Sequence, residues 1–378
     1  MKYHRIRAVA VKELLHIVRD PRSLGMAIAI PMLMLLLFGY ALTLDVDRVP
    51  LRVWDQSESP ASRELVARFE GSRYFSVSPG ARSYAELERA IDAREALLGL
   101  VIPADFADRL GAARQASAQL LVDGSDSNTA TIALGYAEAV AQGYSTDLAL
   151  RVARRSMGPG ALSSPVEYRP RVWFNADLES RNYIIPGLIA VIMMVIAALL
   201  TSLTVAKEWE TGTMEQLIST PVRGPELILG KLLPYFGVGL LDVAIAVVVG
   251  QFLFHVPLRG SVALLFAVAA VFLAAALALG MLISVVTKSQ LMASQLAMIL
   301  TFLPSFLLSG FMYAISNMPK PLQVMTHLIP ARYFVTLLKG IYLKGVGLEV
   351  LGTEAALLAA FGVVTVLLAN RKFRKKIA

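Results

Sequence analysis

Residues 183–206 read YIIPGLIAVIMMVIAALLTSLTVA, a stretch of 24 residues without a charged side chain. A helix needs about 20 consecutive apolar residues to cross a bilayer, so this stretch predicts a transmembrane helix. The composition agrees, because 56% of the 378 residues are hydrophobic and only 17% are charged. Soluble domains carry about 25% charged residues, so the chain is predicted to be an α-helical membrane protein.

Five other stretches have a similar length and character, which gives six predicted transmembrane helices. They cover residues 24–44, 232–254, 261–287, 291–315 and 353–369, of which the last is the shortest. The first of them follows a long basic segment and exceeds the h-region of about 7–15 residues in a cleavable signal peptide. It is therefore interpreted as a span.

Lysine and arginine predict the orientation of these spans, because cytoplasmic segments are enriched in both. Six of these residues lie in segment 1–23 and five in the basic tail, 371–378. Both termini are therefore predicted to be cytoplasmic, which an even number of spans allows. Segment 45–182 then lies on the extracytoplasmic side, and loop 207–231 lies in the cytoplasm.

The charge distribution and composition exclude several kinds of site. Segment 45–182 holds 16 arginines, no lysine and 19 acidic residues, a net charge of −3, so the rest of the chain carries +11, mostly beside the spans. This pattern indicates membrane topology and not a nucleic-acid surface. With no cysteine and only four scattered histidines, we expect neither a disulfide nor a metal centre.

Segment 45–182 has the composition of a soluble domain and alternates strand and helix signals. Strands are expected at 51–54, 74–77, 96–102 and 119–122, with a long helix over 128–155. The alternation predicts an α/β domain inserted between the first and second spans. No cluster in it indicates catalysis, and turn chemistry explains the acidic turn at 123–126 better than cation binding does.

On a helical wheel, residues 5–19 form an amphipathic helix. One arc is apolar, and the other carries Lys12, Glu13, His16, Arg19 and Arg5. Such a helix would lie on the cytoplasmic leaflet with its basic arc toward anionic headgroups. The alternative is a solvated basic segment that only sets the topology.

Loop 207–231, KEWETGTMEQLISTPVRGPELILGK, is the longest predicted cytoplasmic loop between spans. Residues 213–216 fit a capping box and predict a short helix from about Met214. Pro221 ends this helix, and Gly224-Pro225-Glu226 begins the next one. A short rigid helix between two spans suits docking to a cytoplasmic partner; a tight turn without a partner is the alternative.

The end of this loop superficially resembles a phosphate-binding loop, but its spacing excludes one. Five residues separate Gly224 from Gly230, whereas the motif has four. Leu232 follows Lys231 where the motif needs serine or threonine. No nucleotide-binding motif occurs elsewhere, so the chain itself is not expected to bind a cofactor.

Asp242 is predicted near the middle of the third span, where a carboxylate is costly and suggests a function. We interpret it as a polar anchor to a neighbouring helix, with a contact to a substrate pathway and proton coupling as alternatives. No second ionisable residue is expected at this depth, which disfavours a proton relay.

Within the outer segment 316–352, residues 322–343 are mostly apolar but are interrupted by Pro330, Arg332 and Lys339. These interruptions are too frequent for a helix that spans the membrane. Residues 322–343 predict a pair of short helices that re-enter the outer leaflet, which is tolerated when such helices pack against protein. An ordinary external loop is the alternative.

Several of these segments, each at its own place along the chain, resemble the permease subunits of ABC-2 type exporters. They are FNADLESRNYIIPGLIA (174–190), EWETGTMEQLISTPVRGPELILGKLLPY (208–235), LPSFLLSGFMY (303–313) and HLIPARYFVTLLKGIYLKG (327–345). The resemblance covers essentially the whole chain. It is greatest to the multidrug efflux permeases of Gram-negative bacteria.

The resemblance implies an inner-membrane transport subunit that is not itself an enzyme. With a second permease, identical or paralogous, it would form the path for an amphipathic substrate such as a drug or a lipid. A separate ATPase would bind ATP and Mg, and a periplasmic membrane-fusion protein would take part in efflux. None of the motifs identifies the substrate.

The resemblance also implies roles for particular segments. Segment 1–23 corresponds to the family's connecting helix, and segment 316–352, with Pro330 and Arg332, to its re-entrant helices. Loop 207–231 corresponds to the coupling helix that docks into the ATPase. Carried over residue by residue, the coupling positions are Glu208, Glu210, Gly212, Thr213, Glu215, Gln216 and Pro221.

Two other functions are compatible with the residues alone. One is an ion- or proton-coupled secondary transporter that uses Asp242, although inverted repeats and paired intramembrane charges are not evident. The other is a membrane-anchored receptor or scaffold, in which segment 45–182 binds a partner and loop 207–231 is dispensable.

Overall fold

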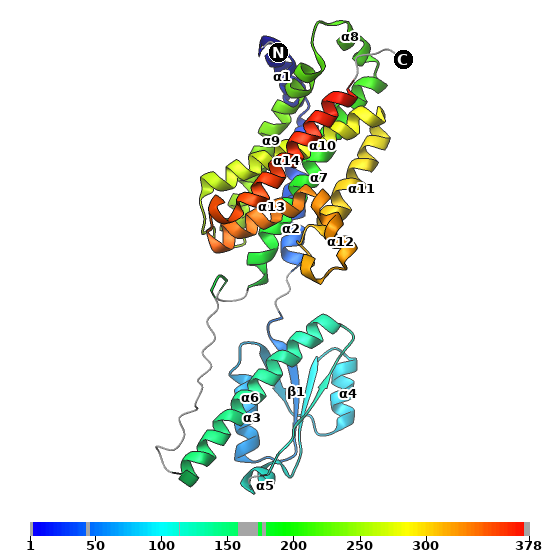
Figure 1. Cartoon of the computed structure of the whole chain (residues 1–378). Coiled ribbons are helices and arrows are strands. Elements are labelled where there is room, and N and C mark those ends of the chain that lie inside the picture. The colour runs from blue at the N-terminus through cyan, green and yellow to red at the C-terminus, as the bar shows by residue number, and fades with distance from the viewer. Residues whose placement is uncertain (1–2, 43–45, 113, 158–172, 176–178, 374–378) are drawn as a thin grey trace. The chain divides into compact units, whose positions relative to one another are not determined.

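The computed structural model describes residues 3–42, 46–112, 114–157, 173–175 and 179–373. It divides into two compact units, one formed by residues 1–43 and 171–378 and the other by residues 44–170 (Figure 1). The part of the basic tail beyond residue 373 lies outside the described residues, as does segment 158–172.

The first unit is built from helices. The N-terminal helix α1 (Tyr3–Arg19) leads into α2 (Pro21–Ala41). The other long helices are α7 (Ser180–Glu210), α9 (Gly224–Phe252), α10 (Val262–Thr287), α11 (Gln290–Leu308) and α14 (Leu348–Lys372). Short helical segments connect them: α8 (Thr213–Ser219), η1 (Ile315–Asn317), α12 (Lys320–Met325), η2 (Thr326–Leu328), α13 (Pro330–Lys339) and η3 (Gly340–Lys344).

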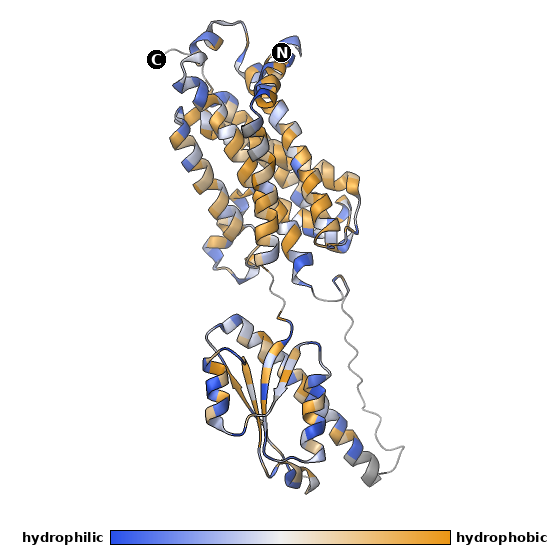
Figure 2. Cartoon of the chain, turned by 180° about the vertical axis from the view of Figure 1, so that it is seen from behind, coloured by the Kyte–Doolittle hydropathy of each residue, from blue (hydrophilic) through white to orange (hydrophobic). Residues whose placement is uncertain are grey.

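Five of the described helices, α7, α9, α10, α11 and α14, are long and apolar enough to cross a membrane. Hydrophobic residues cover most of the length of the long helices in this unit (Figure 2). In α2 the described apolar stretch is shorter and runs over Ala27–Ala41. The chain is therefore a multi-pass helical membrane protein, as stretch 183–206 predicted.

One predicted span boundary is wrong. The fifth span was expected to reach residue 315, but α11 ends at Leu308. Gly310 follows with a φ of +79°, a left-handed conformation that favours glycine and cannot continue the helix. The last span was expected over 353–369, and these residues lie within α14, a helix of 25 residues. The charged residues that extend α14 at both ends suit helix termini.

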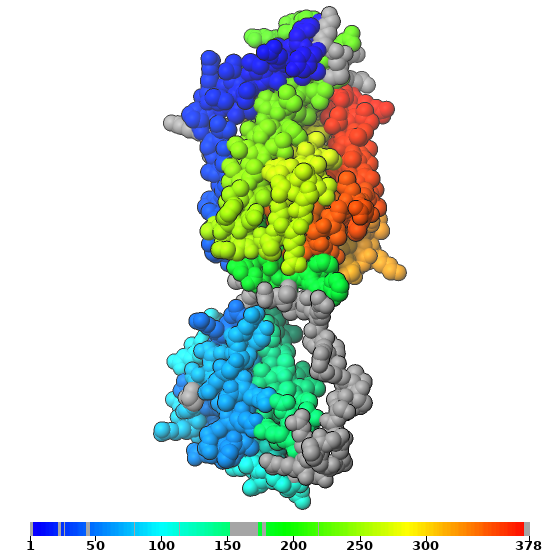
Figure 3. Space-filling view, turned by 90° about the vertical axis from the view of Figure 1, so that its left-hand side faces the viewer, coloured from blue at the N-terminus to red at the C-terminus, as the bar shows by residue number. Residues whose placement is uncertain are grey.

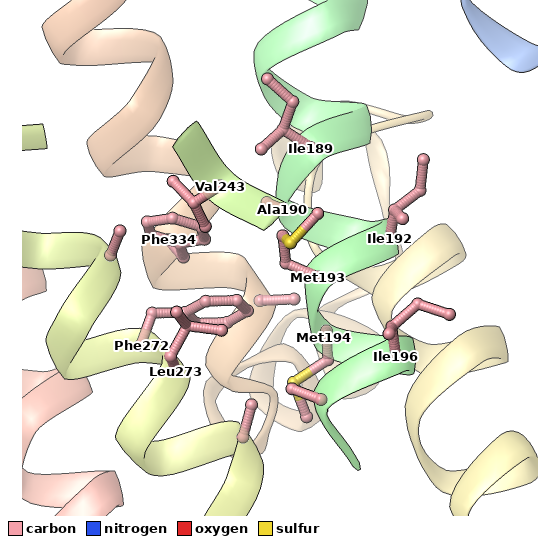
Figure 4. Close-up of a cluster of buried hydrophobic side chains, with 14 of the residues drawn as sticks. Ile189, Ala190, Ile192, Met193, Met194, Ile196, Val243, Phe272, Leu273 and Phe334 are labelled. Carbon is pink, nitrogen blue, oxygen red and sulfur yellow. The ribbon is translucent and has the colours of Figure 1, made fainter. Parts of the chain in front are cut away.

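Helix α7 packs against several helices at once, which explains why stretch 183–206 is apolar on every side. It contacts α2, α9, α10, α11 and α13. Figure 4 shows Ile189 and Met193 of α7 near Val243 of α9 and near two aromatic rings. Those rings belong to Phe272 of α10 and Phe334 of α13, and their centroids are 4.0 Å apart in a stacked arrangement.

Helices α7 and α10 approach each other closely at Gly280. A Cβ atom at this position would lie 2.2 Å from Thr201 Oγ1 and 2.3 Å from the Ala198 carbonyl oxygen. The hydroxyl of Thr201 donates to the Leu277 carbonyl at 2.9 Å. Small residues that permit close approach, with hydrogen bonds between helices, are the usual means of helix association in a bilayer.

The predicted pair of short helices is present as α12 and α13. Pro330 occupies the first turn of α13, where its missing N–H removes no helical hydrogen bond. Arg332 donates to the Thr326 hydroxyl and, from Nη1 at 3.4 Å, to the Gln323 carbonyl. Arg332 therefore ties α13 to the turn after α12.

The second unit contains a four-stranded sheet in the order β2-β1-β3-β4. Its strands are β1 (Val49–Asp55), β2 (Phe75–Pro79), β3 (Leu98–Ile102) and β4 (Gln119–Val122), close to the positions that the sequence predicted. Strand β1 pairs in parallel with β2 and β3, and β4 is antiparallel to β3. The accompanying helices are α3 (Pro60–Glu70), α4 (Tyr84–Asp92), α5 (Phe106–Gly111) and α6 (Ser127–Met157).

Local hydrogen bonds account for the polar turns of this unit. The Ser83 hydroxyl caps α4 by accepting from the Glu86 N–H at 3.2 Å. In the acidic turn, Asp123 accepts from the Ser125 N–H, and Asp126 accepts from the Thr129 hydroxyl. The described residues contain no group of three or more metal-ligating side chains.

Candidate functional site

Helix α1 lies against the beginning of α9, which Figure 3 shows as blue over yellow-green. Gly230 of α9 makes the approach possible, because a Cβ atom there would lie 2.7 Å from Val9 Cβ and 3.0 Å from the Ile6 carbonyl oxygen. Val9 and Ala10 are buried in this contact. The N-terminal helix is therefore packed onto protein.

Four charged side chains meet where α1, α7 and α9 converge, and we call them the charged cluster: Lys12, Glu13, Glu208 and Lys231. The Lys231 Nζ atom lies 2.9 Å from Glu13 Oε1 and 2.8 Å from Glu208 Oε1. The Lys12 Nζ atom lies 3.0 Å from Glu208 Oε1 and 3.5 Å from Glu13 Oε1. Two positive and two negative charges thus compensate each other, which allows Lys231 to be only 1% exposed.

The cluster shifts the pKa values of Glu13 and Lys12. Burial opposes ionisation of Glu13, but the ammonium groups of Lys231 and Lys12 together outweigh it and lower the pKa of Glu13 below its ordinary value of 4.5. Burial likewise opposes the charge on Lys12, whereas Glu208 raises the pKa of Lys12. Because the Glu13 pKa is lower in the folded protein, its contribution to stability is complete at neutral pH and is lost as the pH falls through that pKa.

The predicted orientation of the basic arc of α1 is wrong in part. Arg5 and Lys12 were expected to face lipid headgroups, but Lys12 pairs with Glu208. Arg5 donates to the Pro221 carbonyl and lies 3.7 Å from Glu226. Arg5 and Lys12 face the protein because a buried carboxylate is stable only beside a cation, whereas a lipid headgroup stays in contact with water. The apolar arc of α1 can face lipid instead. The exposed apolar residues of α1 include Val11, Leu14, Leu15 and Val18.

The turn between α7 and α8 differs from the predicted capping box. Gly212 precedes α8 with a φ of +72°, and it has no side chain that could cap the helix. Thr213 already lies within α8, and its hydroxyl donates to the Glu208 carbonyl at 3.4 Å. The left-handed Gly212 thus forms the turn before α8. Thr213 is therefore not the N-cap that the capping-box pattern predicted.

Helix α8 presents an exposed polar face that one buried side chain holds in place. Met214 is 1% exposed and belongs to the main hydrophobic core. Its neighbours Glu215 and Gln216 are exposed. The helix ends at Ser219, and the chain is extended at Thr220 before Pro221, as predicted.

Two of the acidic residues assigned to coupling are engaged within the chain. Glu208 is 8% exposed and lies in the charged cluster, so it is not part of the exposed face of the loop. Glu210 is exposed but accepts from the backbone N–H and the side-chain amide of Gln290, at 2.8 and 2.5 Å. Glu210 therefore joins the end of α7 to the start of α11.

Asp242 is buried in α9 at 1% exposure. Its Oδ1 atom has no hydrogen-bond partner among the described residues. The predicted anchoring contact at this oxygen is therefore not formed within the described part of the chain, where the core around α9 is apolar.

Comparison with known protein families shows which family this chain belongs to. A family model described as ABC-2 family transporter protein matches residues 21–370. The chain belongs to this ABC-2 family. The match spans α2 through most of α14, including the α7–α8–α9 turn and the charged residues of α7 and α9.

Curated relatives of the ABC-2 chain include three permeases of Escherichia coli K12. "Probable multidrug ABC transporter permease YbhS" is 39% identical over 347 residues, which cover 91% of this chain and 90% of the relative. "Probable multidrug ABC transporter permease YbhR" is 30% identical over 375 residues, or 99% and 100% of the two chains. "Inner membrane transport permease YhhJ" is 25% identical over 335 residues, or 87% and 86%.

Sequence reasoning about the ABC-2 chain missed the charged cluster. Glu13 was placed on the polar arc of a surface helix, and Lys231 was considered only as part of a false phosphate-binding motif. A usable signal was present, because Glu13 is the single acidic residue among residues 1–19 and Lys231 directly precedes an apolar span. Such isolated charges next to a span need a partner.

Proposed function

We propose that this ABC-2 chain is the permease subunit of an ATP-driven exporter for an amphipathic substrate such as a drug or a lipid. It would pair with a second permease, identical or paralogous, and the two would form the substrate path. A separate ATPase would bind ATP and Mg and drive transport. Membership of the family, the names of the relatives and the five candidate spans support this proposal.

The exposed face of α8 is the observation that carries the coupling part of the proposal. Because Met214 is buried and Gly212 fixes the turn, Glu215 and Gln216 are held outward on a rigid support. A chain without a nucleotide-binding motif can receive energy from ATP only through contact with a partner. An exposed acidic side chain on a short helix suits contact with a basic residue of an ATPase.

Contacts behind α8 would carry a displacement into the membrane helices. Helix α7 continues into α8 after the Gly212 turn, and the charged cluster joins α7 to α1 and α9. Glu210 adds a link to α11. Movement of α8 by an ATPase would therefore displace several helices together.

The proposed arrangement in the inner membrane has six spans, with α2 as the first. Both termini and the α7–α8–α9 turn would be cytoplasmic, and the unit of residues 44–170 would be extracytoplasmic, where it could meet a membrane-fusion protein. Helices α12 and α13 would then re-enter the outer leaflet. The distribution of lysine and arginine supports this orientation.

Single cysteines will test this orientation, since the chain has no cysteine of its own. In intact spheroplasts, an impermeant maleimide should label Ser125→Cys but should label Ser219→Cys only after lysis. Both positions are exposed, so accessibility to the reagent does not limit the comparison. Labelling in the opposite order would refute the proposed orientation.

Charge reversal at Glu215 will test the coupling contact. In the complex with the ATPase, Glu215→Arg is expected to lower substrate-stimulated ATP hydrolysis at least about tenfold, because like charges opposed in an interface cost several kcal/mol. Gly212→Val should act in the same direction, since a β-branched residue is strained at a φ of +72°.

A matched control separates coupling from folding in that experiment. Glu349 is also an exposed acid in the first turn of its helix, but it lies in α14. Glu349→Arg should keep stimulated hydrolysis at the wild-type level, and all three variants should insert into the membrane normally. Wild-type coupling in both Glu215→Arg and Gly212→Val would exclude this face as the docking element.

A further inference from the structure

A pocket of about 620 Å³ lies between α1, α2, α7 and α9, directly beside the charged cluster. Its lining has two chemically different parts. The polar part includes Lys12, His16 and Lys207, and the apolar part includes Leu24, Leu200 and Leu203. An amphiphile with one charged end and a hydrocarbon chain matches both parts.

The charge that the pocket offers to a ligand is positive. Glu13 and Glu208 also line it, but both are buried and already pair with lysine. Lys207 is exposed at the wall, and no carboxylate within the described part of the chain pairs with it. Lys12 keeps more than half of its side chain exposed while it contacts Glu208. A third carboxylate, Asp20, also lines the pocket at the turn between α1 and α2, but it is half-buried and is engaged in an interaction of its own.

The apolar part of the lining follows the helices that lead into the membrane. Leu24 and Ala27 belong to α2, Leu200 and Leu203 belong to α7, and Val238 belongs to α9. Thr211 and Thr213 lie at the polar end, where their hydroxyls donate to the Lys207 and Glu208 carbonyls and so hold the wall of the pocket in place. A single ligand can therefore contact the α7–α8 turn and the membrane-spanning helices together.

We propose that this pocket binds the phosphate of an anionic phospholipid, with Lys12 and Lys207 at the phosphate and the acyl chain along α2 and α7. Each basic side chain near an anionic lipid surface strengthens binding about fivefold, and the buried chain contributes through its apolar area. The site is separate from the exposed face of α8, and the lipid need not be the transported substrate.

Binding of phosphatidylglycerol to the purified full-length protein in detergent will test the site, with phosphatidylcholine of the same chains as the comparison. Native mass spectrometry should show at least about tenfold preference for phosphatidylglycerol, given two accessible lysines. Equal binding of the two lipids would overturn the proposal. Inorganic phosphate at millimolar concentration should not compete, and competition by it would indicate an ion site and not a lipid site.

Matched variants locate the binding. Lys207→Gln should weaken phosphatidylglycerol about fivefold, whereas Lys372→Gln, at an exposed lysine outside the pocket, should not. Leu203→Trp should fill the apolar part and reduce binding at least tenfold, whereas Val363→Trp at an exposed position should not. If Leu203→Trp fails to fold, the Lys207→Gln comparison alone decides. Unchanged binding in Lys207→Gln, or an equal loss in Lys372→Gln, would refute the proposal.

Discussion

Replacing Lys231 by methionine is expected to destabilise the folded protein by about 3–5 kcal/mol, the range for removing one partner of a buried ion pair. Lys231 is the buried cation that contacts both Glu13 and Glu208, at 2.9 and 2.8 Å. Without it, one exposed lysine, Lys12, has to compensate two buried carboxylates. The measurement is the apparent melting temperature and the yield of monodisperse protein in detergent.

A compensating variant and a control distinguish this loss from a general effect of lysine removal. In Lys231→Met combined with Glu13→Gln, Glu208 still pairs with Lys12 at 3.0 Å, so much of the stability should return. Lys207→Met, at an exposed lysine in the last turn of α7, should change the stability by less than about 0.5 kcal/mol. Equal melting temperatures for Lys231→Met and the wild type would show that the cluster does not hold α1 in place.

Replacing Gly280 by valine is expected to prevent folding of the helical unit. The first added carbon would already lie 2.2 Å from Thr201 Oγ1 and 2.3 Å from the Ala198 carbonyl oxygen. The second of these atoms is backbone, so helices α7 and α10 would have to separate, and the hydrogen bond from Thr201 to the Leu277 carbonyl would be lost. Size-exclusion chromatography after detergent extraction should show aggregated protein.

The control for this prediction is Gly237 of α9, where an added Cβ would meet no atom within 4 Å. Gly237→Ala should be neutral or stabilise the helix by up to about 1 kcal/mol, because alanine has the higher helix propensity. Gly280→Ala, by contrast, should already lower the yield, since the conflict arises at Cβ. Normal yields of both Gly280 variants would contradict the close packing of α7 against α10.

The sequence was sufficient where one local property determines the outcome. In lipid, a single uncharged stretch such as 183–206 can form all the hydrogen bonds of its backbone N–H and C=O groups only as a helix. Its structure therefore follows without knowledge of its neighbours. Pro221 and Gly224-Pro225 likewise fixed the boundaries between α8 and α9, because proline acts on the adjacent backbone. The strands of the second unit were also located by local alternation and turn residues.

Errors arose where two local signals competed. The capping-box pattern at 213–216 suggested a side-chain cap, but a left-handed Gly212 made the turn instead. In the fifth span, hydropathy continued past the point where Gly310 breaks the helix. Hydropathy averages over a window, whereas a helix ends at a single residue with an incompatible φ.

The sequence by itself determined that this is a multi-pass helical membrane protein, and its motifs indicated the ABC-2 family. Only the tertiary structure decided how the charges of α1 are used. Glu13, Glu208 and Lys231 lie on three different helices, with Glu13 and Lys231 218 residues apart, and no periodicity relates them. A buried charge is stable only beside its counter-charge, so the partner of each one is set by how the helices pack.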